Sequence, residues 1–272
     1  MLTAACEFAG TRRPTTPTPS RAVNVVAIAE KNSVTVIHVF VALCDNIHQG
    51  IVPVSATLGN GDDAARNLYW GAAFGVKTFF TKSRDWELVY CQAGPDDGQF
   101  IIERCVFKHR DREAFMVADA YRGSEIRRAT QNFLQAAAGQ PAETITPSID
   151  GRLYSLHLGG SGRLIAYTGH DGLMDFRLTS PPKKLDNEER DAIILACASK
   201  SYFADALRLT GARPLLWTTN LMAPEAYILA AAIEGWLRKE TDEQIRSRAA
   251  KAYDQYQHCG QRRADNLFAT GW

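Results

Sequence analysis

The 272-residue chain lacks the features that mark several classes of protein. No apolar run reaches the ~18–20 residues that a helical membrane span needs, so the sequence predicts no such span. The formal net charge is only +1, which produces no strong field toward nucleic acid, and we expect no nucleic-acid partner. The glycine-rich segment 59–63 lacks the lysine and hydroxyl residue of a phosphate-binding P-loop and predicts a turn. These absences predict no cofactor.

The six cysteines include no Cys-x-x-Cys pair, which argues against a structural zinc site. No HExxH metal signature occurs either, so we expect no metal. Several cysteines lie in apolar runs, where a free thiol behaves as a small hydrophobic side chain. Free thiols favour a reducing compartment, and the cytoplasm is the predicted location. Export is the alternative, if the N-terminal MLTAACEFAG is the end of a truncated signal sequence.

Composition predicts one large folded domain behind a short tail. Apolar residues make up 46% of the chain, enough to build a sizeable core. The segment TRRPTTPTPSRA is rich in proline, threonine and arginine, which is typical of disordered chain. We therefore expect a disordered tail over residues 1–22 and a single domain over residues 23–272. The sequence does not indicate an oligomeric state.

Strand-like and helix-like segments alternate along the domain. Apolar, β-branched runs predict strands at 34–44, 86–91, 100–107, 114–121, 153–158, 163–168, 191–197 and 213–219. Helices are expected at 64–80, 125–138, 199–211, 223–239 and 241–258, and Ser124 is expected to cap the second of them. The turns GPDDG and GGSG predict hairpins between their flanking strands. Such alternation favours an α/β fold with a mostly parallel sheet covered by helices on both faces.

Two predicted strands end in residues that can perform nucleophilic chemistry. His170 follows the run RLIAYT, and Cys197 follows DAIILA and precedes a helix. Functional groups gather where parallel strands end, and one crossover can make these two strands neighbours. A thiolate is a strong nucleophile, and an imidazole can serve as its base and acid. Two further thiol–imidazole pairs are weaker candidates. Nothing in the sequence positions an oxyanion donor for Cys44 with His48, and Cys105 with His109 lies near the charged turn KHRDRE and is expected to be a strand edge.

The segments LIAYTGHDG and AIILACASKSYF resemble the His and Cys motifs of the caspase-like (clan CD) cysteine peptidases, with the closest likeness to legumain and bacterial CHAT versions. The order of elements is similar over about residues 34–238. The resemblance implies a three-layer caspase-like fold with a small β-hairpin insertion. It also implies a cysteine endopeptidase, a hydrolase acting on a protein or peptide. Cys197 would be the nucleophile and His170 the acid and base, with backbone amides of Cys197 and of Asp171 or Gly172 holding the oxyanion.

The chain departs from the family pattern at several positions. Asp171 separates His170 from Gly172, and Lys200 stands where the family has glycine. No last strand of the kind that caspases use to dimerise is evident. These departures leave open a catalytically silent caspase-like domain that acts as a protein-binding module. An unrelated doubly wound domain that binds a small molecule is a further alternative.

Substrate preference is predicted from acidic residues near the expected cleft. In caspase-like peptidases, residues at the end of the first strand line the pocket for the residue before the cleaved bond. Asp45 stands there, and Asp175 follows the catalytic His. These carboxylates would favour cleavage after arginine or lysine. Ser199, two residues after Cys197, is the third predicted substrate-binding residue. The alternative for Asp45 is that it caps the backbone of its own loop.

Overall fold

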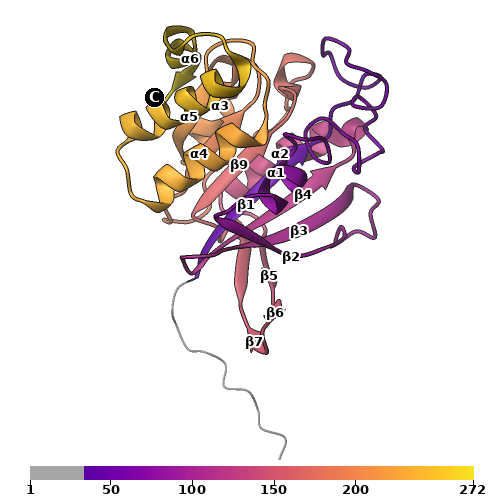
Figure 1. The fold of residues 1–272 in the computed structure, drawn as a ribbon. Helices are drawn as coiled ribbons and strands as arrows, with labels where there is room; N and C mark the ends of the chain where they lie inside the picture. The colour runs from indigo at the N-terminus through magenta and orange to yellow at the C-terminus, as the bar shows by residue number, and fades with distance from the viewer. Residues whose placement is uncertain (1–33) are drawn as a thin grey trace, which may run out of the picture.

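A computed structural model describes residues 34–272 of the chain (Figure 1). The expected tail, residues 1–22, and the start of the expected domain lie outside the described residues. In the described part, one sheet has the strand order β12-β11-β10-β9-β1-β4-β3-β2. Its parallel strands are β1 (Thr35–Ala42), β4 (Ala114–Tyr121), β9 (Leu164–Thr168), β10 (Asp191–Leu195) and β11 (Arg213–Thr218). At its edges, β2 (Trp86–Ala93), β3 (Ile101–His109) and β12 (Phe268–Ala269) each pair antiparallel with a neighbour. The predicted α/β class with a mostly parallel sheet is confirmed.

Helices pack on both faces of this sheet, as predicted. Ile37, Val39 and Val41 of β1 face one core, and Phe40 and Ala42 face the other, because successive side chains of a strand alternate. The first core is covered by α1 (Val76–Thr81), α4 (Ala226–Leu237), α5 (Asp242–Gln257) and α6 (Gln261–Leu267). The second is covered by α2 (Ile126–Ala137) and α3 (Ser199–Thr210). None of the helices described is long and apolar enough to cross a membrane.

A small β-hairpin projects from the domain between α2 and β9 (Figure 1). It consists of β5 (Ala142–Ile145) paired with β8 (Leu156–Gly159), and it is extended by β6 (Ser148–Ile149) and β7 (Arg152–Leu153). The predicted hairpin across GGSG is therefore wrong, since β8 pairs with β5 and β9 enters the main sheet between β1 and β10. Every residue of β9 is buried, because a central position in the sheet covers both faces of this apolar strand.

The helix predicted over 64–80 is wrong for most of its length. Residues 64–75 form successive turns, and only α1 is helical. A Cβ on Gly71 would lie 2.1 Å from the carbonyl oxygen of Ala65, so the chain folds back on itself more tightly than a helix allows. The amide of Asn67 ties this segment to the end of β1, accepting from Cys44 N–H and donating to the Cys44 carbonyl.

One further helix start differs from the sequence-based expectation, and another agrees with it. Ser124 does not cap α2, because it lies inside a 3-10 turn, η1 (Gly123–Glu125), that precedes the helix. Glu125 is the residue at the N-cap position of α2, and no side chain caps the helix there. Thr241 caps α5 in a reciprocal pair with Gln244, so this helix begins where its sequence indicates. The chain ends in a strand that its sequence did not indicate, and whether it is of the kind that caspases use to dimerise stays a prediction. β12 pairs antiparallel with β11, but its two residues are too short to show strand periodicity.

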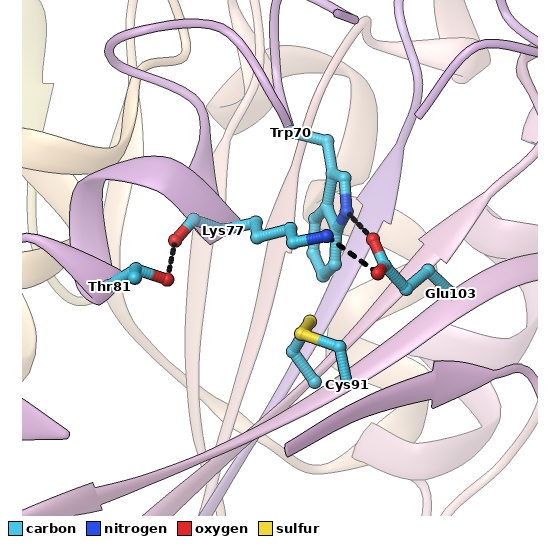
Figure 2. The surroundings of a disulfide bond; sticks show 6 residues. Trp70, Lys77, Thr81, Cys91 and Glu103 are labelled. Carbon is cyan, nitrogen blue, oxygen red and sulfur yellow. Dashed lines mark hydrogen bonds and ion pairs between the residues drawn. A yellow bond between two sulfur atoms is a disulfide. The ribbon is translucent and has the colours of Figure 1, made fainter. Parts of the chain in front are cut away.

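Two of the cysteines form a disulfide, which corrects the expectation of free thiols. Cys91 and Cys105 stand directly opposite each other in the β2–β3 hairpin, the one predicted around GPDDG. Figure 2 shows Glu103 beside the disulfide, with Trp70 Nε1 and Lys77 Nζ each donating to its carboxylate at 2.6 Å. The prediction of a reducing compartment rested on free thiols and loses that support.

Candidate active site

His170 and Cys197 come together at the carboxyl edge of the sheet. β9 and β10 are parallel neighbours, with Thr168 opposite Leu195 at their ends. Each functional residue follows its strand by two positions, so both leave the sheet at the same level. Their side chains line one cavity of about 310 Å³. The predictions that the strands are neighbours and that both residues face one cleft are confirmed.

The imidazole of His170 is buried and held by a carboxylate. Its Nε2 lies 2.8 Å from Asp175 Oδ2, and the backbone N–H of Gly50 donates to the same oxygen at 2.9 Å. A Cβ on Gly50 would come within 2.3 Å of the other carboxylate oxygen, so a side chain there would displace Asp175. The Tyr167 hydroxyl donates to the carbonyl of His170 at 2.8 Å. These contacts fix the ring and leave Nδ1 without a hydrogen-bond partner among the described residues.

Cys197 lies in a turn between β10 and α3. Ala198, the next residue, has a left-handed backbone with φ of 47°, and α3 begins directly after it. The Cys197 sulfur contacts the backbone of Met222, accepting from its N–H at 3.4 Å and donating to its carbonyl at 3.5 Å. Burial raises the pKa of the Cys197 thiol, the Met222 backbone opposes this, and the charge of Asp171 adds to it. In the resting protein the Cys197 side chain is therefore a neutral thiol rather than a thiolate.

Asp171 and Gly172, the predicted oxyanion residues, lie at the start of a 3-10 turn, η2 (Gly172–Met174). Asp171 is fully buried; one carboxyl oxygen accepts from Leu173 N–H at 2.9 Å, and the other has no partner. Burial raises the pKa of Asp171 to about 7. Neither residue contributes to the lining of the cavity, to which this turn contributes Met174. Their role as oxyanion donors stays a prediction.

The structure separates the predicted substrate-binding residues. Asp45 is buried outside the cavity lining, where its carboxylate accepts from the backbone of Ile47 and His48 and pairs with the His48 ring at 2.8 Å. Ser199 is buried as well, and its hydroxyl joins the Ile194 carbonyl to the Thr218 side chain. Asp175 does reach the site, through His170. The sequence predicted Asp175 as a substrate-binding residue and did not predict its contact with His170.

The other thiol–imidazole pairs offer weaker chemistry. Burial raises the pKa of Cys44 to about 11, and the ring of its expected partner, His48, pairs with Asp45 instead. Cys105 is half of the disulfide and cannot act as a nucleophile. Among the described residues, one group of possible metal ligands comes together, namely Cys91, Glu103 and Cys105. The disulfide occupies both sulfurs of that group, so it does not form a metal site in this state.

Much of the cavity wall comes from segments that the sequence did not mark as functional. The loop between β1 and α1 contributes Gly50, Ile51, Val52 and Val54, and the segment after β11 contributes residues 221–225. These positions carry no motif. Their place in the chain could have identified them, because both segments follow parallel strands and such loops meet at one edge of the sheet.

Comparison of the chain with protein-family models, with curated proteins and with solved structures finds no match. The function of this chain therefore has to be argued from its own residues and geometry.

Proposed function

We propose that the chain is a caspase-like cysteine endopeptidase in which His170 and Cys197 form the catalytic dyad. One observation carries the proposal. A thiol and an imidazole follow neighbouring parallel strands and line the same cavity at the carboxyl edge of the sheet. The sequence motifs around these two residues are those that resemble the caspase-like group, and the caspase-like topology is part of the same proposal.

In this mechanism the Cys197 sulfur attacks the carbonyl carbon of a peptide bond and forms a thioester. His170 takes up the thiol proton and passes it to the leaving amine as the carbon–nitrogen bond breaks. A water molecule then attacks the thioester while His170 accepts its proton, and the thiol is regenerated as the acid leaves. The raised pKa of Cys197 requires the proton to move during attack, because little thiolate exists beforehand.

Asp175 acts here as a positioning residue. Its contact with Nε2 directs Nδ1 of His170 toward the reaction, and its negative charge stabilises the imidazolium that forms when the ring takes a proton. The N–H of Gly50 keeps the carboxylate in place. In this proposal Asp175 is a third group of the site, and the sequence motifs did not identify it in that role.

The test combines labelling with matched variants. Iodoacetamide and a peptidyl acyloxymethyl ketone should label Cys197, located by mass spectrometry, and Cys197→Ala should abolish both the label by the ketone and peptide turnover. His170→Ala should abolish turnover while leaving the thiol in place. Cys259→Ala is the control, because Cys259 is another partly exposed free thiol outside the cavity lining. Full turnover in Cys197→Ala would exclude the proposed dyad.

One observation favours the alternative of a silent protein-binding module. No cation contacts the Cys197 sulfur among the described residues, and the pKa of its thiol is raised rather than lowered. A module of this kind would resist the acyloxymethyl ketone and turn over no peptide, although it would fold normally. The labelling experiment therefore separates the two functions.

A further inference from the structure

The cavity that holds His170 and Cys197 is lined mainly by apolar side chains. They come from the loop after β1, from η2 and from the segment after β11, which lie far apart in the sequence. The apolar members of the lining are Ile51, Val52, Val54, Leu68, Met174, Leu221, Met222, Ala223 and Pro224. Pockets of this kind bind apolar groups and use few polar atoms for orientation.

Several of these apolar side chains are exposed in the free protein. Val52 is 85% exposed, Leu221 is 66% exposed and Met174 is 40% exposed, and all of them belong to the same cavity wall. Exposed apolar side chains that gather around a cavity mark a binding surface, because water in contact with them is released when a ligand covers them. The rim therefore favours an apolar occupant.

The cavity lining offers little negative charge. Glu225 is the acidic residue of the lining, and its Oε2 accepts from the Tyr227 hydroxyl at 2.8 Å and from Gln257 Nε2 at 2.9 Å. The Asp45 carboxylate is satisfied by its own loop, and Asp175 is paired with His170. A lysine or arginine entering the cavity would lose water against a wall that is mainly apolar, and Glu225 is the single carboxylate among the lining residues that it could meet.

We infer that this cavity binds a bulky aliphatic side chain of the substrate, such as leucine or methionine, at the residue whose carbonyl group Cys197 attacks. The inference rests on the proposed function, since it assigns the substrate class of the same site. It replaces the preference for basic residues suggested by Asp45 and Asp175 with one set by the apolar wall.

A panel of fluorogenic peptides that differ only at the residue before the cleaved bond tests the preference. Leucine and methionine substrates should exceed those with arginine, lysine and aspartate by about 10-fold or more in kcat/KM, as is typical when an apolar pocket recognises side chains. Acyloxymethyl ketones with leucine or arginine at that position should label Cys197 at rates in the same order. An arginine substrate equal to or better than leucine would overturn the inference.

Two matched variants show whether the cavity wall sets the preference. Val52→Asp places a carboxylate on the wall, and Ile47→Asp makes the same kind of change at an 84% exposed residue of the same loop outside the lining. Val52→Asp should lower the leucine-to-arginine ratio of kcat/KM about 10-fold, and Ile47→Asp should leave it unchanged. Equal ratios in both variants and the unaltered protein would mean that the wall does not contact this side chain.

Glu225→Gln provides the reverse test. If the apolar wall sets the preference, leucine substrates should still exceed arginine substrates by about 10-fold or more in kcat/KM in this variant. A selective fall in arginine turnover would show that Glu225 binds cations and would contradict the inference. The outcomes also distinguish the two proposals. Turnover that depends on Cys197 but favours arginine overturns the apolar preference alone, while absence of both labelling and turnover with every peptide overturns the proposed function and the preference with it.

Discussion

Asp171 carries a buried carboxyl group beside the proposed dyad, and replacing it with asparagine should stabilise the protein in a pH-dependent manner. The side chain is fully buried, and one of its oxygens has no partner. Burial raises the pKa of Asp171 to about 7; the N–H of Leu173 opposes this, and the charge of Asp175 adds to it. The folded protein therefore keeps this proton under conditions in which the unfolded chain has released it.

The sign and size follow from linkage between protonation and folding. An aspartate in the unfolded chain has a pKa of about 3.9, whereas the pKa of Asp171 in the folded protein is about 7. The folded state therefore loses stability as the pH rises from the first value to the second. The loss is roughly 1.5 kcal/mol near pH 5 and roughly 4 kcal/mol near pH 8, both as order-of-magnitude values. Asparagine carries no charge at either pH. Asp171→Asn should therefore gain about 2.5 kcal/mol more in unfolding free energy near pH 8 than near pH 5.

Urea unfolding followed by tryptophan fluorescence at both pH values measures this difference. Any constant cost of the new amide group cancels, because it is the same at both pH values. Asp205→Asn is the matched control, because the same substitution there replaces a fully exposed carboxyl group. An Asp171→Asn effect of equal size at the two pH values would show that Asp171 titrates normally, and the reasoning from its burial would be wrong.

Three further predictions concern other parts of the molecule. Asp175→Asn should lower kcat by about 10²–10⁴-fold with little change in KM, because the imidazole loses its orienting charge; Gly50→Ala should act in the same direction, and a change in KM alone would contradict the positioning role. Asp119 is buried against Arg104 and His38, whose hydrogen bonds and charges outweigh burial and lower its pKa to about 2. Asp119→Asn should lower the unfolding free energy by about 3–5 kcal/mol near pH 7. This loss should shrink as the pH falls from about 4 toward 2, because the carboxylate becomes protonated there. Denaturant unfolding at pH 7 and across that acidic range measures the loss and its pH dependence. Reduction of the Cys91–Cys105 disulfide, which spans a sequence separation of 14, should lower the unfolding free energy by about 3 kcal/mol; an unchanged midpoint in urea with reductant would contradict it.

The sequence by itself determined the elements whose residues carry a continuous local pattern. The apolar runs around β1, β4, β9 and β10 predicted buried strands, because a strand enclosed on both faces must be apolar along its whole length. Residues that directly follow such strands must leave the sheet at one edge, which made His170 and Cys197 predictable as a pair. The cap of α5 also depends on a local pattern, because Thr241 and Gln244 lie within one turn of each other.

Contacts between distant segments were decided only by the tertiary structure. The turn before α1 reads as a helix locally, but its close backbone approach at Gly71 and its ties to the end of β1 outweigh that preference. The β5–β8 pairing was likewise set by burial of β9 in the main sheet. Asp175 and Gly50 are 125 positions apart, and no local pattern connects them. The two residues of the proposed dyad could thus be located from the sequence. Asp175, which contacts His170, and the apolar wall of the cavity depend on side chains that only folding brings together.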